Sequence, residues 1–222
     1  MSEKLKIEQQ PNITGDAFCR HETLVGLPFY DDGLITLYCG NAEDYIGSFS
    51  PSIIITDPPY PNKQNHFIDG IEAAIKVIEN EDCLHWMIFW DEMSKPPSKL
   101  PLVAKHIWHR NNSNRPDNYE MIYEYMVDGV KRASRVLPYP VIYPGLTGCK
   151  EATGHPTQKN YKLMMKLISI SRTNGLIYDP FAGSGTTLIA ARKLRRKAVG
   201  IEKDEHWCNV IVDRLNQMEM SL

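Results

Sequence analysis

The chain contains the sequence Ile53-Ile54-Ile55-Thr56-Asp57-Pro58-Pro59-Tyr60, in which a run of β-branched residues leads into two prolines. The run predicts a buried strand at residues 53–56, and the prolines end it because they fix φ and lack an N–H donor. In open α/β sheets, ligands bind beyond the carboxyl ends of the strands. Asp57 and Tyr60 are therefore expected to face a substrate. An Asp-Pro turn with a purely structural role after an ordinary strand would, however, have the same sequence pattern.

Strand and helix patterns alternate along the chain on both sides of this sequence. Short β-branched and aromatic runs predict strands, and apolar residues at helical spacing predict helices. Such alternation is typical of an α/β fold with a mostly parallel sheet. The expected strands are residues 34–39, 53–56, 85–90, 105–110, 121–127, 176–178 and 198–202. The expected helices are residues 42–48, 67–79, 156–172, a segment ending near residue 194, and 205–218.

Composition and charge limit the class of protein. The 222 residues are 42% hydrophobic and 23% charged, which is typical of one globular domain with a sizeable core. The net charge of -2 gives no overall basic field. Any contact with nucleic acid would therefore depend on local basic patches.

The cysteines and the apolar segments favour a cytoplasmic protein. The cysteines lack the spacing of metal ligands and are expected to be reduced thiols, with no disulfide and no zinc site. The first residues, 1–11, are polar, and no segment reaches the ~20 apolar residues of a membrane span. We therefore expect neither a membrane nor a metal partner. The cysteines are Cys19, Cys39, Cys83, Cys149 and Cys208.

A glycine-rich turn at residues 179–187 suits a second ligand site. Gly183 and Gly185 allow the backbone to turn tightly and approach a ligand, near the N–H groups of the following helix. The turn lacks the lysine of a phosphate-binding loop, and Leu188 replaces the third glycine of a GxGxxG motif. Glu202 ends the next expected strand, where an acidic side chain can accept ribose hydroxyls. Each part alone also fits a structural role, but the pair at consecutive strand ends favours a nucleotide-like ligand.

Three motifs occur in the order Asp57-Pro58-Pro59-Tyr60, His155-Pro156-Thr157-Gln158-Lys159 and Asp179-Pro180-Phe181-Ala182-Gly183-Ser184-Gly185-Thr186. In this order the chain resembles the permuted (β-group) S-adenosylmethionine-dependent DNA amino-methyltransferases. In that family, as here, the catalytic half precedes the cofactor half. The resemblance extends over about residues 34–215.

The resemblance implies an α/β fold with a single Rossmann-like methyltransferase domain. Its sheet would be mostly parallel and seven-stranded with one antiparallel hairpin strand, and helices would cover both faces. The domain would occupy residues 33–222 after an N-terminal extension at residues 1–32. The catalytic half would be residues 33–130 and the cofactor half residues 154–222, separated by a short target-recognition excursion at residues 131–153.

The resemblance also implies a role for each motif. Asp57 and the carbonyl of Pro58 would accept the two hydrogens of the target amine, beside Pro59, and Tyr60 would stack on the flipped base. S-adenosyl-L-methionine would be the cofactor and DNA the partner. The expected cofactor-binding residues are Asn41, Asp57, His155, Thr157, Lys159, Asp179, Phe181, Gly183, Ser184, Gly185, Thr186 and Glu202. The expected nucleic-acid contacts are Asn62, Lys63, Arg110, Arg115, Lys131, Arg132 and Arg135.

Within these implied roles, more detailed positions follow. The glycine turn would surround the methionine moiety of the cofactor, with Glu202 at the ribose and Asn41 near the adenine. His155, Thr157 and Lys159, at the start of a helix, would lie by the cofactor's carboxylate.

Two positions depart from the family pattern. Asn41 stands where Asp is frequent, and its amide can still hydrogen-bond to adenine. Asn160 stands where the family's helix-opening run usually ends in Pro, so the start of that helix should be less rigid.

The expected reaction is methylation of adenine N6 in DNA, and N4-cytosine methylation is the alternative within the same chemistry. An RNA methyltransferase and a catalytically silent nucleic-acid-binding subunit are further hypotheses. Because few side chains are available to read DNA, we expect a very short target sequence or a homodimer. The expected setting is a bacterial or phage-infected cell, with a role in restriction-modification among the possibilities.

Overall fold

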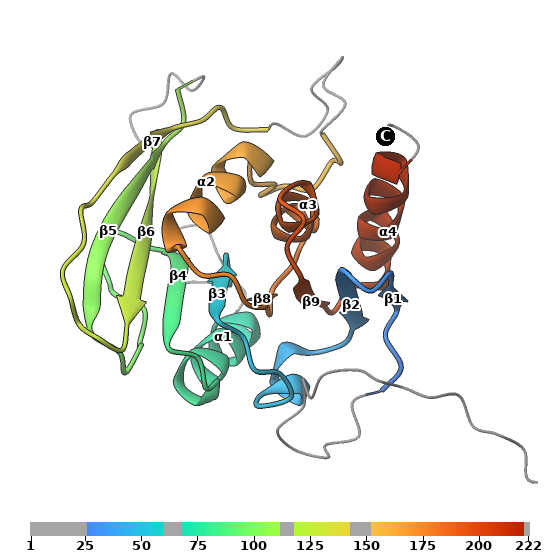
Figure 1. The fold of residues 1–222 in the computed structure, drawn as a ribbon, viewed down its shortest axis with the longest axis horizontal. Coiled ribbons are helices and arrows are strands. Elements are labelled where there is room, and N and C mark those ends of the chain that lie inside the picture. Colours follow the sequence, from blue (N-terminus) through green and yellow to red (C-terminus); the bar gives the residue numbers. More distant parts are fainter. Residues whose placement is uncertain (1–25, 60–67, 112–117, 143–151, 220–222) are drawn as a thin grey trace, which may run out of the picture.

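In the computed structural model, residues 26–59, 68–111, 118–142 and 152–219 are described, and their strands form one mixed sheet. Helices α2, α3 and α4 cover one face of this sheet, and α1 covers the other (Figure 1). The strands are β1 (Tyr30–Asp31), β2 (Ile35–Cys39), β3 (Ile53–Thr56), β4 (His85–Trp90), β5 (Leu102–His109), β6 (Tyr119–Met126), β7 (Val136–Pro138), β8 (Ile177–Asp179) and β9 (Ala198–Glu202). The helices are the 3₁₀ helix η1 (Ala42–Tyr45), α1 (Ile68–Asn80), α2 (Tyr161–Ser171), α3 (Thr186–Lys193) and α4 (Glu205–Glu219).

The strand order is β1-β2-β9-β8-β3-β4-β6-β5-β7. Strands β2, β9, β8, β3 and β4 are parallel, and β6 runs antiparallel to both β4 and β5. The expected mostly parallel sheet with a reversed hairpin strand is confirmed. Because five neighbouring strands are parallel, their carboxyl ends meet at one edge of the sheet.

The sheet has two more strands than the seven expected. Strand β1 has two residues and pairs antiparallel with β2, so the sheet begins at Tyr30. Strand β7 has three residues and pairs parallel with β5 within residues 131–153, where no strand is expected. Both are too short to leave a sequence period, and Pro138 is tolerated in β7 because this strand lies at the edge of the sheet.

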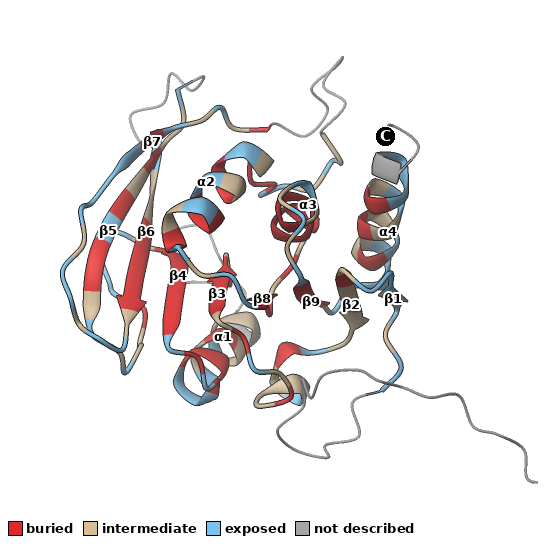
Figure 2. Cartoon of the chain, viewed as in Figure 1, coloured by how far each residue is buried: buried red, intermediate tan, exposed pale blue. Residues whose placement is uncertain are grey.

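The central strands are buried on both faces, which is why they are continuously apolar. Ile53 and Ile55 pack into the core beneath α2, α3 and α4, whereas Ile54 packs into the core beneath α1. Strand β4 alternates in the same way, with Phe89 on the first side and Trp86 on the second. Figure 2 shows β3 and β4 buried along their length. This double burial is typical of parallel sheets.

Helix α2 begins at Tyr161, so the expectation of a helix from Pro156 is wrong. Asn160 is the N-cap, and its side chain accepts a hydrogen bond from the backbone N–H of Lys162 at 2.9 Å. The same side chain donates to the carbonyl of Pro140 at 3.0 Å. Proline cannot supply this cap. The residues before the cap therefore stay outside the helix, and two of them, Gln158 and Lys159, are buried together with the cap itself.

Among the described residues, the cysteines are free thiols and no metal site is formed. Cys39, Cys83 and Cys208 make no disulfide, whereas Cys19 and Cys149 lie outside the described residues. No group of three His, Cys, Asp or Glu side chains in this part of the chain is placed to hold a metal ion. None of the described helices has the length and apolar character needed to cross a bilayer.

Candidate active site

A small cleft opens where β3 and β8 end. The two strands are parallel neighbours, and Asp57 follows the first while Asp179 ends the second. The cleft is lined by Asp57, His155, Thr157, Lys159, Met164, Asp179, Phe181, Ala182, Gly183, Ser184, Thr186 and Thr187. It therefore brings together the residues expected at the cofactor, except Asn41, Gly185 and Glu202.

Asp57 is held at the cleft by an ion pair with a buried lysine. Its Oδ2 accepts a hydrogen bond from Nζ of Lys159, and the two side chains are 20% and 8% exposed. Burial raises the pKa of Asp57 to about 6, the charge of Lys159 opposes this rise, and the nearby Glu120 adds to it. At neutral pH the carboxylate is mostly ionised, so it acts as a hydrogen-bond acceptor.

Lys159 lies between two carboxylates and two aromatic rings. Its ammonium is 3.2 Å from Oε2 of Glu120 and lies 5.1 Å and 5.7 Å from the ring centroids of Phe89 and Trp108. The sequence predicts Lys159 at a helix start, by the cofactor's carboxylate. In the structure Lys159 precedes α2, lines the cleft and pairs with Asp57. Glu120 is not among the residues predicted at the site, because a lone Glu near the start of a hairpin strand carries no motif.

The glycine turn between β8 and α3 requires its glycines. Gly185 is the N-cap of α3 at φ +75°, and a Cβ atom there would lie 2.7 Å from Cγ1 of Ile211. Gly183 also has a positive φ, +55°. Other residues rarely adopt this backbone region. The backbone N–H of Gly183 donates to Oε2 of Glu202 at 2.8 Å, which links the turn to the end of β9.

Asp179, the last residue of β8, holds the same turn through hydrogen bonds. Its Oδ1 accepts hydrogen bonds from Oγ1 of Thr56 at 2.8 Å and from the backbone N–H of Phe181 at 3.2 Å. Burial raises the pKa of Asp179 to about 6, while hydrogen bonds from Thr187 and Thr56 oppose the rise. Through Thr56, the turn is connected to the strand that carries Asp57.

Glu202 and Asn41 lie at the ends of adjacent strands beside the turn. Glu202 is paired in register with Cys39 of β2, and the backbone N–H of Gly40 donates to the Glu202 carbonyl at 2.9 Å. Burial raises the pKa of the Glu202 carboxyl, whose Oε1 accepts from the backbone N–H of Asp204 at 2.9 Å. The two residues therefore occupy neighbouring positions, although neither lines the enclosed part of the cleft.

Helix α4 contributes two residues that the sequence did not indicate. The ring of Trp207 packs edge-on against His155 with centroids 4.5 Å apart, and Arg214 donates to the carbonyl of Ser184. Burial, with Lys159 and Arg214 nearby, lowers the pKa of His155 to about 4, so its imidazole is neutral. The helical period of α4 already accounts for both residues as packing positions, which is why the sequence did not single them out.

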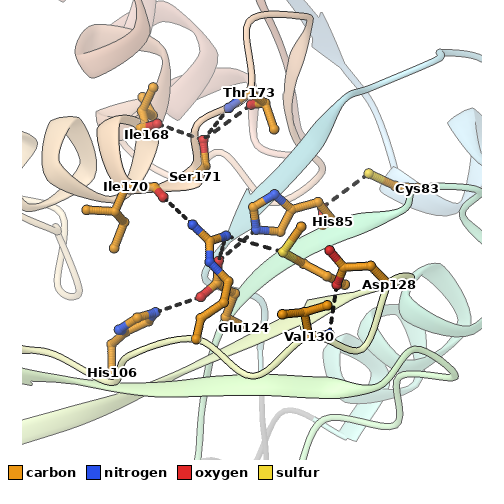
Figure 3. A network of polar contacts seen from close by, with 12 residues as sticks. Cys83, His85, His106, Glu124, Asp128, Val130, Ile168, Ile170, Ser171 and Thr173 are labelled. Atoms are coloured by element: carbon orange, nitrogen blue, oxygen red, sulfur yellow. Dashed lines mark hydrogen bonds and ion pairs between the residues drawn. The ribbon is translucent and has the colours of Figure 1, made fainter.

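Arg132 belongs to a buried polar cluster, which corrects its expected role at DNA. Its guanidinium donates to Oε1 of Glu124 and to the carbonyl of Ile170. Glu124 also contacts Nε2 of His85 at 2.9 Å and Nε2 of His106 at 3.1 Å (Figure 3). His85 is the first residue of β4, whereas the cleft lies where the parallel strands end. This guanidinium is therefore committed to the interior.

The other residues expected at DNA differ in their surroundings: Arg110 is paired near the site, and Lys131 and Arg135 are exposed. Arg110 donates to the carbonyl of Tyr119 at 2.9 Å and is 3.5 Å from Oε1 of Glu120, close to the site. Lys131 donates to the carbonyl of Leu102 while remaining exposed, and Arg135 is exposed. The remaining members of the predicted catalytic and DNA-contact sets lie outside the described residues. They are Tyr60, Asn62, Lys63 and Arg115.

Comparison with known proteins gives matches in sequence. A family model described as DNA methylase matches residues 89–213. The type II methyltransferase M.ScaI of Streptomyces caespitosus is 37% identical over 268 aligned positions, which cover 89% of this chain and 86% of the relative. M2.LlaDCHI of Lactococcus lactis subsp. cremoris is 34% identical over 158 residues, covering 66% of this chain. The chain spans about half the length of this second relative, 53%.

Solved structures match in fold. The PvuII DNA methyltransferase, described as cytosine-N4-specific, aligns with a TM-score of 0.62 and 17% identity, covering 84% of this chain and 88% of that one. The complex of M1.HpyAVI with SAM aligns with a TM-score of 0.57 and 23% identity, covering 82% and 100%. At such identities the likeness concerns the fold, and it confirms the expected Rossmann-like α/β class.

Proposed function

Because this chain belongs to the N6/N4 family of DNA methylases, we propose that it transfers a methyl group from S-adenosyl-L-methionine to the exocyclic amine of a base in DNA. The observation that carries this proposal is the single cleft in which Asp57, after β3, meets the glycine turn after β8. S-adenosyl-L-methionine is the methyl donor of this family. The proposal assigns the donor to the turn and the target base to Asp57.

The residues beside the turn fit this donor. Gly183 and Ser184 line the cleft, and the carboxylate of Glu202 accepts a hydrogen bond from the backbone N–H of Gly183. A carboxylate oxygen that already accepts one N–H can accept a further hydroxyl hydrogen. Glu202 would thus hold the ribose hydroxyls, Asn41 would lie by the adenine, and the turn would surround the methionine moiety.

The residues at the other side of the cleft fit an amine substrate. When bound, the cofactor supplies an electrophilic methyl group on a sulfonium. The exocyclic amine is a poor nucleophile because its lone pair is conjugated into the ring. Asp57 and the carbonyl of Pro58 would accept its two hydrogens and direct the lone pair toward the methyl group; one of these hydrogens leaves as a proton after transfer. Tyr60 would stack on the base after it leaves the duplex.

Replacing Glu202 with Ala should weaken binding of S-adenosyl-L-methionine by about 5- to 150-fold, since losing a partner of a buried polar group costs about 1–3 kcal/mol. Isothermal titration calorimetry measures this affinity. Glu205→Ala, three residues further along and exposed, is the matched control. Glu202→Gln keeps one acceptor oxygen and should lose less. Equal affinities in all four proteins would contradict the assignment of Glu202 to the ribose.

We propose adenine N6 as the target, because within the family Asp before Pro-Pro-Tyr is associated with adenine and Ser with cytosine. Mass spectrometry of nucleosides from DNA treated with the protein and cofactor should detect N6-methyladenine. Plasmid DNA from a host without methyltransferases provides the blank. Detection of N4-methylcytosine alone would reverse the choice of base.

DNA is the partner that we propose, and RNA is the alternative with the same amine chemistry. A groove along α2 presents lysines and tyrosines that suit a phosphate backbone, in addition to Arg110 and Arg135. Incubation with labelled cofactor and either nucleic acid separates the two, and a silent subunit would label neither. A homodimer would enlarge the DNA-contact surface of this short chain, and the bacterial relatives favour a bacterial or phage setting. The residues of the groove are Tyr139, Tyr161, Lys162, Met165, Lys166, Ser169 and Lys193.

A further inference from the structure

A row of alternating charges leads away from Asp57. Lys159 joins Asp57 to Glu120, and Glu120 is in turn 3.5 Å from the guanidinium of Arg110. The first three side chains are largely buried, with exposed fractions of 20% for Asp57, 8% for Lys159 and 18% for Glu120. These residues come from the ends of β3 and β5, from the start of β6, and from the extended segment before α2.

Two features indicate that this row serves more than folding. Burying an ion pair is a weak source of stability, because desolvation offsets most of the attraction. In addition, the hydrogen bond from Lys159 is accepted by one oxygen of Asp57, Oδ2, and a carboxylate has a second oxygen that can accept from another donor. The rings of Phe89 and Trp108 flank the ammonium and limit its movement.

We propose that Lys159 and Glu120 are positioning residues for methyl transfer: Lys159 clamps Oδ2 of Asp57 so that Oδ1 faces the target amine, and Glu120 holds Lys159 in place. This inference rests on the proposed function and adds two residues to it. Arg110, the residue after β5, lies 3.5 Å from the other carboxylate oxygen of Glu120, Oε1. The clamp therefore connects the catalytic carboxylate with a cation near the expected DNA surface.

The charges that face Asp57 predict opposite effects of the two positioning residues. Lys159 approaches from the segment before α2, Glu120 from β6 and Asp179 from β8, with His155 further along the cleft. Lys159 holds the pKa of Asp57 down, whereas Glu120 raises it. Removing the lysine should therefore raise the pKa of Asp57, and neutralising the glutamate should lower it.

The experiment compares Lys159→Met, Lys159→Arg and Glu120→Gln with the unchanged protein. We would measure kcat, the KM for S-adenosyl-L-methionine, and kcat/KM for DNA between about pH 5 and 8. Lys159→Met should lower kcat by about 10-fold or more with little change in KM for the cofactor, since the acceptor loses its fixed geometry. The acid limb of its pH profile of kcat/KM should move to higher pH, and the acid limb for Glu120→Gln should move to lower pH. Lys159→Arg should restore part of the activity.

A surface pair of the same chemistry provides the control. Lys76 of α1 contacts Glu43 of η1 at 3.1 Å and is 58% exposed, so Lys76→Met should leave both kcat and the pH profile unchanged. If the unchanged protein methylates DNA but neither acid limb moves, the positioning roles are wrong while the proposed function stands. If the acid limbs of Lys159→Met and Glu120→Gln move in the same direction, the clamp is also refuted. Absence of methylation by the unchanged protein would instead overturn the proposed function.

Discussion

Replacing Asp57 with Ala should reduce methyl transfer by at least about 100-fold, because the amine loses the acceptor that directs its lone pair. Affinity for S-adenosyl-L-methionine should stay within a few-fold, since Asp57 acts on the base. The variant should still fold, because the ammonium of Lys159 keeps Glu120 as a partner at 3.2 Å. Incorporation of labelled methyl groups into DNA and calorimetric titration of the cofactor measure the two quantities separately.

Two further variants test whether the loss of turnover is specific to the charge and position of Asp57. Asp57→Asn keeps the shape and one acceptor oxygen but removes the charge, so it should be impaired less than Asp57→Ala. Glu72→Gln changes an exposed carboxylate on α1 and should leave turnover unchanged. Turnover by Asp57→Ala close to that of the unchanged protein would refute the catalytic role of Asp57.

Replacing Glu124 with Ala should lower the free energy of unfolding by about 3–5 kcal/mol, the usual cost of breaking a buried ion pair. The carboxylate is almost fully buried and accepts from Arg132, His85 and His106. Its removal leaves the guanidinium with the carbonyl of Ile170 as its remaining oxygen acceptor. Urea denaturation at pH 7 measures the loss, and Glu79→Ala, exposed on α1, is the matched control.

The destabilisation by Glu124→Ala should depend on pH. Burial alone would raise the pKa of Glu124, but hydrogen bonds from His106 and His85 and the charge of Arg132 lower it to about 2, from 4.5. A lowered carboxyl pKa contributes stability that is present above the unfolded value and lost as the pH falls toward the folded one. The difference between the two proteins should therefore shrink between about pH 4.5 and pH 2 by about 3 kcal/mol. A constant difference across this range would contradict the lowered pKa.

The parts of the fold that the sequence predicted best are those with burial on both sides. Strands β3, β4 and β9 begin and end at the predicted residues, because a strand packed on two faces must be apolar throughout. The position of the cleft also followed from sequence, since two motifs end neighbouring parallel strands. Strands β1 and β7 could not be predicted, because two or three residues carry no period.

The side chains that complete the site were not predictable for a different reason. Glu120 and Lys159 are 39 positions apart, and only the pairing of β6 with β4 and β5 brings the glutamate to the cleft. Arg132 resembles a free surface cation in the sequence, because nothing local marks Glu124, a polar residue within a strand, as its partner. A local pattern reports which way a side chain faces, and it does not report which distant charge that side chain meets.

The order of the strands also constrains how the chain matures on the ribosome. Strands β2 and β3 follow one another in the sequence, yet β9 and β8 lie between them in the sheet. In a nascent chain that has emerged only as far as β7, the edges of β2 and β3 that will later pair with β9 and β8 have no partner strand. Unpaired strand edges of this kind favour wrong pairing. The chain up to β7 is made first, but its strands cannot form the continuous sheet until β8 and β9 have been synthesised.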